Sequence, residues 1–332
     1  MAILIKRVQD YKRIDKTGTG MHICTMTEIE KELPIQQIPE NFKSGFVAIV
    51  GRPNVGKSTL MNALVGEKLS IVSYKASTTR HRIYGILTGE NFQIVYSDTP
   101  GLIKPAYELQ NAMMHFVNQA LEDADVILAV TDGLKTGVDP ELFEILKASE
   151  LPRILVINKI DKSTQEDTEA KMALWKEALP ELNVIAVSAQ EKFNLEGIMT
   201  FMLEHTPVHP PYYPLDQITE QTERFFAAEM IREQVFAKLD KEIPYSTTVE
   251  IESFKETPEL LRISALIIVE RQSQKAIMLG HQGKNIKAIA TRARLEMEKF
   301  FGQKVFLETF VKVDEDWKSE KKKLSRHGFG LS

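Results

Sequence analysis

FVAIVGRPNVGKS (residues 46–58) is the stretch that decides the fold. Its apolar run, 46–50, is typical of a buried strand, and a helix-forming run, 57–64, follows closely. Between them, GRPNVGKS fits the pattern G-x-x-x-x-G-K-[ST], in which glycines let backbone amides approach phosphate oxygens at a helix N-terminus. The stretch therefore predicts a phosphate-binding loop formed by Gly51, Arg52, Pro53, Asn54, Val55, Gly56, Lys57, Ser58 and Thr59.

Two side chains of this loop suit a nucleoside triphosphate. The Lys57 ammonium can reach the β- and γ-phosphates, and the Ser58 hydroxyl can be a ligand of Mg²⁺. Taken alone, the loop does not distinguish ATP from GTP, or a kinase from a switch protein.

Strand, loop and helix patterns alternate downstream of this loop. The apolar runs that predict strands are 83–87, 92–97, 126–130, 154–157 and 184–187. The first two flank the turn 89–91, which is typical of a hairpin, and helical patterns follow the last three. The alternation predicts an α/β domain with a mostly parallel sheet and helices on both faces. Ligands of that architecture bind at the carboxyl ends of the strands.

Asp98-Thr99-Pro100-Gly101 comes directly after the strand predicted over 92–97. A carboxylate at this end of a strand can hold Mg²⁺, usually through a water molecule. The backbone amide of Gly101 can bind the γ-phosphate and lose that contact after hydrolysis. An ordinary turn is the alternative, but the position downstream of a phosphate-binding loop favours a metal and γ-phosphate sensor.

A third motif, NKID, follows the strand predicted over 154–157. Its aspartate, Asp161, can accept hydrogen bonds from both N1–H and the exocyclic amine of guanine. Adenine lacks this pair of donors and would leave a buried carboxylate unpaired. Lys159 can cover the purine ring, and a backbone amide after the last strand can bind the guanine carbonyl oxygen. The motif predicts GTP and GDP as ligands, held by Asn158, Lys159, Ile160, Asp161, Ser188 and Ala189.

The second half of the chain follows a proline-rich connector, 207–215, and has a different pattern. A long amphipathic helix is expected over 216–241, and the later predicted elements are strands 247–254, 261–269 and 305–313 and a helix 284–301. We therefore expect a larger domain over 45–206 and a smaller α+β domain over 216–332. Residues 1–44 are expected to be a disordered leader, with Met21 or Met26 as the alternative start.

GHQG (residues 280–283) lies between two helical patterns in the smaller domain. A helix–GxxG–helix unit is typical of a KH domain, in which the tight loop clamps the backbone of about four nucleotides. The order of strands matches the second KH type. The predicted RNA-binding residues are Gly280, His281, Gln282, Gly283, Lys284, Lys287 and Arg292, with Arg294 as a further phosphate contact. The basic stretch 317–326 is expected to be a solvated charged helix in preference to a direct RNA contact.

Composition limits the classes of protein that remain. The chain has 332 residues, a net charge of −4 and one cysteine, which excludes an internal disulfide framework and a globally basic surface. Its apolar runs are far shorter than the ~20 residues that cross a bilayer. A cytoplasmic protein is expected.

The motifs in this order, with the segment TTRHR (78–82), the connector and GHQG, resemble the Era family of bacterial ribosome-assembly GTPases. The resemblance covers the chain from about Gly45 onward and implies a P-loop GTPase domain followed by a type II KH domain. It further implies binding near the 3′ end of 16S rRNA, a role in maturation of the 30S subunit, and a monomer. It also implies a threonine ligand of Mg²⁺ beside Ser58 and Asp98 in the GTP state, for which Thr79 is chosen and Thr78 is the alternative.

The resemblance also bears on the rate of hydrolysis. Leu102 and Ile103 stand where Ras-like enzymes have a glutamine that orients water, which predicts slow intrinsic turnover. Asn54 is a candidate for holding K⁺ near the phosphates, where the charge would act as an arginine finger does. The expected catalytic residues are thus Lys57, Asn54 and Thr79.

Two alternatives from other classes stay open. A membrane-surface signalling GTPase would use the second domain to dock on lipid or protein, with peripheral contact at the inner face of the cell membrane. A metabolic P-loop kinase is disfavoured by the NKID motif.

Overall fold

The computed structural model describes residues 38–330, except 74, 76, 135 and 136. Most of the expected leader, including Met21 and Met26, therefore lies outside the described residues. The end of that leader differs from the expectation, because the first strand begins at Lys43 and the Phe42 side chain is only 2% exposed. The chain from Asn41 onward forms one compact unit.

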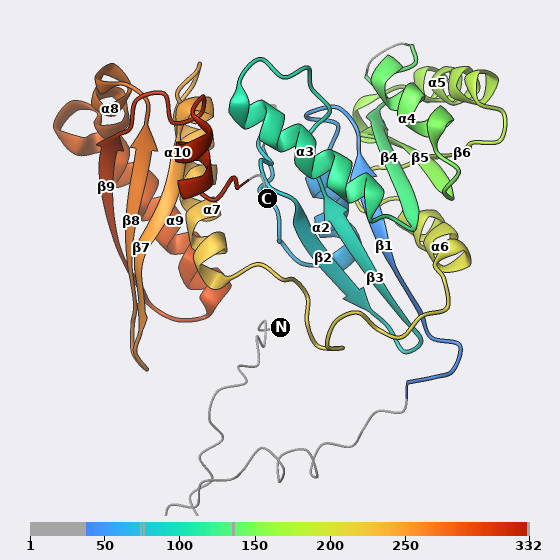
Figure 1. Ribbon diagram of the computed structural model, residues 1–332, viewed down its shortest axis with the longest axis horizontal. Helices are drawn as coiled ribbons and strands as arrows, with labels where there is room; N and C mark the ends of the chain where they lie inside the picture. Colours follow the sequence, from blue (N-terminus) through green and yellow to red (C-terminus); the bar gives the residue numbers. More distant parts are fainter. Residues whose placement is uncertain (1–37, 74, 76, 135–136, 331–332) are drawn as a thin grey trace, which may run out of the picture. The chain divides into compact units, whose positions relative to one another are not determined.

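A six-stranded sheet forms the centre of the larger domain (Figure 1). Only β2 is antiparallel to its neighbour, β3; the other strands pair in parallel, as the alternating sequence pattern predicts. The strands, in spatial order, are β2 (Ile83–Thr88), β3 (Phe92–Asp98), β1 (Lys43–Val50), β4 (Val126–Asp132), β5 (Arg153–Asn158) and β6 (Asn183–Ala186).

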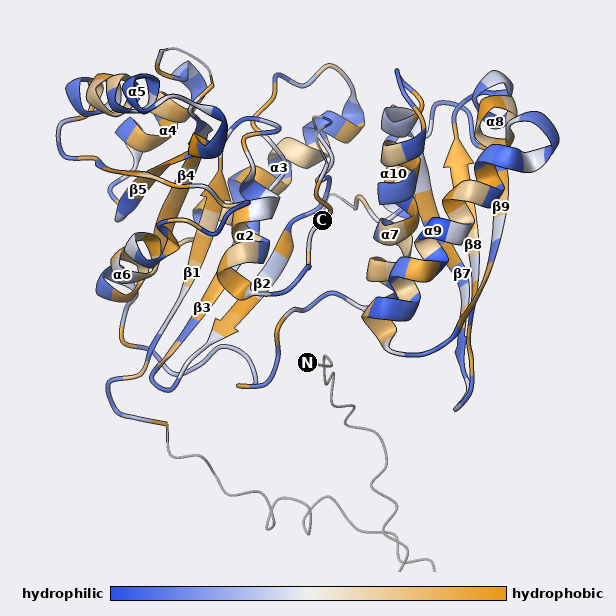
Figure 2. Cartoon of the chain, turned by 180° about the vertical axis from the view of Figure 1, so that it is seen from behind, coloured by the Kyte–Doolittle hydropathy of each residue, from blue (hydrophilic) through white to orange (hydrophobic). Residues whose placement is uncertain are grey.

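Successive residues of β1 point to opposite faces of this sheet, and each face has its own helical cover. Val47 and Ile49 pack with α2 (Lys57–Val65) and α6 (Leu195–His205). Ala48 and Val50 pack on the other face. The helices there are α3 (Glu108–Glu122), α4 (Pro140–Ala148) and α5 (Gln165–Ala178). Burial on both faces explains why the strands are nearly continuous apolar runs, seen in orange in Figure 2.

The connector after α6 is bonded to the larger sheet instead of standing free. The backbone N–H of His209 donates to the carbonyl of Phe42, and Gln93 and Tyr213 exchange two hydrogen bonds of 3.0 Å. The helix expected over 216–241 is shorter than predicted. The carbonyl of Ile218 accepts from the edge strand β2, so α7 begins only at Glu223, capped by Thr222.

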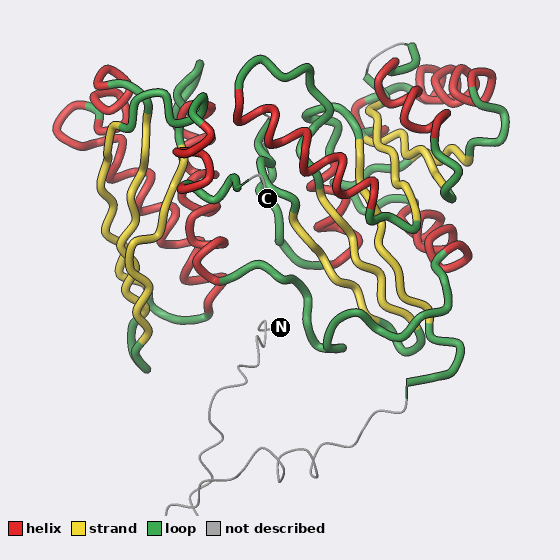
Figure 3. The backbone as a smooth tube through the Cα atoms, viewed as in Figure 1, coloured by secondary structure: helices red, strands yellow, loops and turns green. Residues whose placement is uncertain are grey.

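The smaller domain has a three-stranded sheet in the order β7-β8-β9, with helices packed on one face (Figure 3). Strand β8 is antiparallel to β7 and parallel to β9. Its elements are α7 (Glu223–Lys238), η2 (Pro244–Ser246), β7 (Thr248–Glu256), β8 (Leu261–Val269), α8 (Gln272–Leu279), η3 (His281–Gly283), α9 (Lys284–Phe301), β9 (Val305–Val313) and α10 (Lys321–Arg326). The order α-β-β-α-α-β is that of the type II KH domain expected from the sequence.

The chain after β9 is packed more closely than a solvated helix. The basic residues of α10 include exposed Lys321 and Lys322, but Trp317, Leu324 and Phe329 are at most 2% exposed. These three side chains form one apolar cluster with residues of α3. The expectation that 317–326 is fully solvated was wrong, because apolar residues spaced between the lysines pack against α3. Among residues 38–330, apart from the four that are not described, none of the helices has the length and hydropathy of a membrane-spanning segment.

Ile289 and Leu295 of α9 allow a direct test of the smaller core. Ile289 is fully buried, whereas Leu295 is 44% exposed. Substitution Ile289→Ala should lower the free energy of unfolding of this domain by about 2–5 kcal/mol, because it leaves a cavity. Leu295→Ala should cost well under half as much. Urea titration followed by far-UV circular dichroism measures both, and equal costs would contradict the packing described.

Candidate functional site

The phosphate-binding loop joins β1 to α2, and its glycines are required by close contacts. Gly51 and Gly56 have φ of 153° and 96°. A Cβ atom at position 51 would collide with the carbonyl of Val130, and one at position 56 would collide with the Asn158 carboxamide. The loop is therefore pressed between β4 and the NKID motif, with its amides at the N-terminus of α2.

Lys57 is buried in this loop, where its ammonium meets two backbone carbonyls. Its ammonium donates to the carbonyls of Gly51 and Arg52 at 3.0 and 2.9 Å. Burial lowers the pKa of Lys57 to about 8, and the nearby Asp98 carboxylate opposes that shift. A poorly solvated cation at a helix N-terminus is suited to binding the anionic oxygens of a phosphate.

Three oxygen-bearing side chains meet at the N-terminus of α2. The Ser58 hydroxyl donates to Asp98 Oδ2 at 2.7 Å and lies 2.9 Å from the Thr79 hydroxyl. Asp98 is fully buried; its Oδ1 has no hydrogen-bond partner, and burial raises its pKa. Such a carboxylate fits a hard divalent cation, which would restore its charged form. Thr78 instead donates to the carbonyl of Lys75, so the structure places Thr79 in this group.

The sensor motif after β3 touches the phosphate-binding loop through its backbone. A Cβ atom at Gly101 would lie 2.5 Å from the Pro53 nitrogen, so only glycine allows this approach. Thr99 donates to the carbonyl of Ile49 at 2.6 Å, and Pro100 beside it is buried. Leu102 is buried in the core under the sheet, and Ile103 packs with the α3 cluster, so neither offers a polar group.

The NKID motif ties three loops together. The Asn158 carboxamide donates to the carbonyl of Val55 and accepts from the amide of Ala189, both at 3.0 Å. Lys159 donates to the carbonyl of Asn54, and Ser188 donates to Asp161 Oδ1 at 2.6 Å. The amide of the intervening Ile160 donates to the carbonyl of Val187. The residues expected to bind the guanine base thus come from two loops, the NKID motif and the loop of Ser188 and Ala189. Asn158 bonds one loop to the other.

One cavity of about 390 Å³ is lined by a part of these groups. Asp98, Asn158, Asp161, Ser188 and Ala189 are not among the residues that line it. Its lining includes Asn54, Lys57, Ser58, Thr79, Gly101 and Lys159.

The GHQG loop opens α9 with a left-handed backbone. Gly280, Gln282 and Gly283 have φ of 70°, 51° and 74°. A Cβ atom at Gly280 would lie 2.8 Å from the Asn285 side chain, which itself bonds the carbonyl of Ile277 at the end of α8. The side chains available to a ligand here are exposed: His281, Gln282, Lys284, Lys287 and Arg292. Arg294 departs from the expectation, because it is half-buried and bonded to Glu298 at 2.7 Å.

Arg80 is a residue to which the sequence alone gives no role. It follows Thr79 directly, yet its guanidinium is 3% exposed and is bonded to the smaller domain. Burial lowers its pKa to about 9, which leaves it charged at neutral pH. The segment TTRHR was the available signal, but its partners lie more than 160 residues further along the chain.

Comparison with known families matches two parts of the chain. A model described as a 50S ribosome-binding GTPase matches residues 46–159, and a KH domain model matches residues 242–318. GTPase Era from Alkaliphilus metalliredigens is 41% identical over 87% of this chain and 99% of its own length. GTPase Era from Clostridium acetobutylicum is 42% identical over 87% of this chain and 98% of its own.

Solved structures of relatives match over the same extent. A variant of Era from Aquifex aeolicus bound to GDP and AlF4⁻ is 38% identical, with a TM-score of 0.84. A structure of Era in complex with MgGDPNP and nucleotides 1506–1542 of 16S ribosomal RNA has the same identity and TM-score. Each comparison covers 87% of this chain and 100% of the solved one.

The bridging role of Asn158 can be tested by stability alone. Substitution Asn158→Ala leaves the carbonyl of Val55 and the amide of Ala189 without this partner. We expect the free energy of unfolding to fall by about 2–4 kcal/mol, since each buried polar group left unpaired costs about 1–3 kcal/mol. Asn111→Ala, on the exposed side of α3, is the matched control and should change it little. Chemical denaturation measures both. A loss of unfolding free energy in Asn158→Ala no larger than in the control would contradict the bridging role of Asn158.

Proposed function

This chain belongs to the Era family of GTPases, and on that premise we propose that it hydrolyses GTP with Mg²⁺ and binds 16S rRNA near its 3′ end during 30S subunit assembly. The solved Era complex with MgGDPNP and an rRNA fragment carries this proposal, because it matches this chain over both of its domains. A cytoplasmic monomer is part of the proposal.

The preference for guanine rests on Asp161. Its Oδ1 accepts from the Ser188 hydroxyl at 2.6 Å, and Ala189, the residue after Ser188, donates its amide to Asn158. One acceptor atom of this exposed carboxylate is thus oriented before a base arrives. Guanine presents two donors to such a carboxylate, and adenine presents none in that arrangement. The unpaired carboxylate that adenine would leave makes discrimination large.

The side chains of Ser58, Thr79 and Asp98 would hold Mg²⁺. This ion supplies positive charge beside the phosphates. Lys57 would bind phosphate oxygens in place of the two carbonyls it now bonds, and the amides of the loop would orient them. Gly101 would give its amide to the γ-phosphate, since its backbone already abuts Pro53.

Slow intrinsic turnover is part of the proposal. Neither Leu102 nor Ile103 can orient or polarise a water molecule, and Leu102 is turned into the core. Asn54 is exposed, with a φ of 64°, and lies on the lining of the nucleotide cavity, where K⁺ could add charge near the phosphates.

Binding of RNA is favoured over docking on a membrane or a protein by the state of the GHQG loop. His281 and Gln282 are exposed, and the basic residues at the start of α9 stand beside them. A membrane-docking domain would gain nothing from two left-handed glycines framing this loop. Peripheral membrane contact is therefore not part of the proposed function.

Potassium dependence gives a direct test of Asn54. Single-turnover hydrolysis of GTP should be slow in NaCl and several-fold faster in KCl at equal ionic strength, because K⁺ would stabilise developing negative charge. Asn54→Ala should remove the difference between the salts while retaining binding of GDP. Equal rates of the unchanged protein in the two salts would contradict the role of Asn54.

RNA binding can be tested with two glycines of the same conformation. Gly283 and Gly302 have φ of 74° and 69°, and only Gly283 belongs to the GHQG loop. Gly283→Asp should weaken binding of a 16S rRNA 3′-end oligonucleotide at least tenfold, since it adds bulk and negative charge where phosphates must approach. Gly302→Asp carries the same backbone strain and charge and should bind as the unchanged protein does.

Fluorescence anisotropy with GDP or a non-hydrolysable GTP analogue measures this binding. Tighter binding with the analogue is expected. If both variants bind the oligonucleotide as the unchanged protein does, the smaller domain serves another partner.

A further inference from the structure

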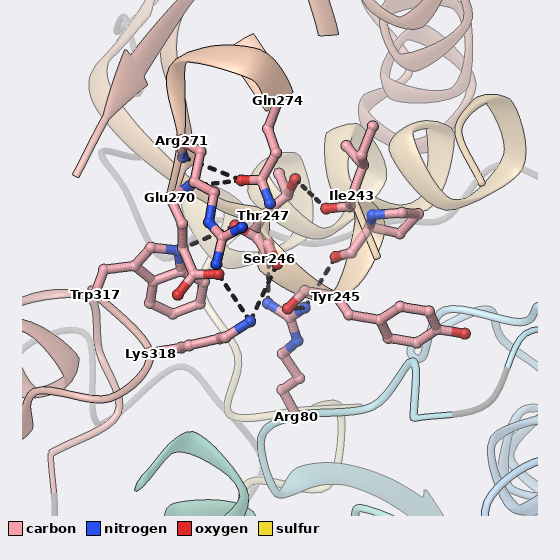
Figure 4. A network of polar contacts seen from close by, with 11 residues as sticks. Arg80, Ile243, Tyr245, Ser246, Thr247, Glu270, Arg271, Gln274, Trp317 and Lys318 are labelled. Atoms are coloured by element: carbon pink, nitrogen blue, oxygen red, sulfur yellow. Dashed lines mark hydrogen bonds and ion pairs between the residues drawn. The ribbon is translucent and has the colours of Figure 1, made fainter. Parts of the chain in front are cut away.

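The guanidinium of Arg80 is enclosed by backbone carbonyls of the smaller domain. Its Nη1 donates to the carbonyl of Thr247 at 2.6 Å, and its Nη2 donates to those of Pro244 and Tyr245, both at 3.0 Å (Figure 4). We call these three acceptors the carbonyl cage. A planar guanidinium suits such a set, because its donors point in fixed directions.

The carbonyl cage is held in shape by its own bonds. Thr247 donates from its hydroxyl to the carbonyl of Ile243 at 2.7 Å. Trp317, from the chain after β9, donates its indole N–H to the carbonyl of Ser246 at 3.0 Å, and its ring lies 5.9 Å from the guanidinium carbon of Arg80. Lys318 bonds the Ser246 hydroxyl and forms a 2.7 Å ion pair with Glu270. The acceptors are thus fixed by the fold of the smaller domain.

One peptide bond joins Arg80, which occupies this cage, to a residue of the candidate metal site. Thr79, the residue before Arg80, has its hydroxyl 2.9 Å from that of Ser58. Consecutive Cα atoms are about 3.8 Å apart, so a displacement of the Arg80 backbone also displaces Thr79. The bonds of Arg80 to the cage therefore restrain the backbone that carries Thr79.

A second basic residue anchors the same segment. The Lys75 ammonium donates to the carbonyls of Phe236 and Leu239, both at 2.6 Å, and pairs with Asp240 at 2.8 Å. These acceptors lie at the C-terminal end of α7, which favours a cation. Lys75 and Arg80 are thus both bonded to the smaller domain.

Arg80 is directed away from the reacting groups. It is not among the described residues that line the nucleotide cavity, and each of its two terminal nitrogens bonds the carbonyl cage. An arginine that stabilised the transition state directly would have to leave these bonds and cross Thr79. Its influence on the reaction must pass through the position of its neighbour.

We propose that Arg80 is a positioning residue for GTP hydrolysis, through which the smaller domain holds Thr79 beside Ser58 and Asp98. The inference rests on the proposed function. Because coupling between sites is reciprocal, a ligand that shifts the carbonyl cage would also change the affinity for GTP. The smaller domain would then act on the hydrolytic site without supplying a group that touches the nucleotide.

The test compares three variants of the full chain: Arg80→Ala, Arg80→Lys and Arg224→Ala. Arg224 is the matched control, since its guanidinium also bonds backbone carbonyls. Those carbonyls belong to Ile251 and Glu252, and neither belongs to the cage around Arg80. For each protein, affinities for GDP and GDPNP, the Mg²⁺ concentration for half-maximal GDPNP binding, and kcat for GTP are measured. Circular dichroism melting checks that each variant is folded.

Arg80→Ala should lower GDPNP affinity and kcat by about tenfold each, raise the Mg²⁺ requirement, and leave GDP affinity within about twofold. Arg80→Lys should give intermediate values, because an ammonium can bond part of the cage; it carries the test if the alanine variant does not fold. Arg224→Ala should match the unchanged protein.

Three results would overturn the inference. The first is an Arg80→Ala protein with unchanged GDPNP affinity and kcat. The second is a loss of kcat with unchanged GDPNP affinity and Mg²⁺ requirement, which would mean a direct contact with the transition state. The third is an equal loss of GDP and GDPNP affinity. Failure of the unchanged protein to bind GDP or hydrolyse GTP would instead overturn the proposed function itself.

Discussion

Parallel pairing of β1 with β3 and β4 is the constraint on which the rest of the larger domain depends. In a parallel sheet all carboxyl ends lie at one edge, so the loops that follow these strands must meet there. The register sets Ile49 opposite Asp98, which brings the carboxylate proposed to hold Mg²⁺ beside the phosphate-binding loop. Continuous apolar burial on both faces keeps that register fixed, and the polar groups are confined to the edge.

Concentrating charge at this edge has an energetic cost. Lys57 and Asp98 are both removed from water, and each has its pKa displaced by burial in the direction that disfavours its charge. Hydrogen bonds from Ser58 and to backbone carbonyls offset part of this cost. The remaining imbalance would favour binding of a phosphate and a divalent cation, since both would restore charges that the fold alone leaves poorly compensated.

The smaller domain contributes to this edge through main-chain atoms. The carbonyl cage around Arg80 exists because two carbonyls of η2 and that of Thr247, the residue after η2, accept from one guanidinium. Trp317, from the chain after β9, donates to the carbonyl of Ser246 in the same turn. A link made of backbone acceptors is insensitive to side-chain changes in η2 but sensitive to its backbone position. That property suits the positioning role proposed for Arg80.

From the sequence alone, the parallel sheet and the KH topology could be predicted and the nucleotide motifs located, because each leaves a local pattern in the chain: alternating apolar runs and helical patterns, or glycines that a local turn requires. Strand β9 was predicted from alternation within itself, and it spans the predicted residues. The resemblance had already favoured Thr79 over Thr78, and the structure places Thr79 beside Ser58. Only the tertiary structure decided that Arg294 pairs with Glu298 and that Arg80 is caged. The reason is physical: these outcomes depend on which surface of another element lies opposite each side chain, and no local periodicity encodes the partner of a single arginine.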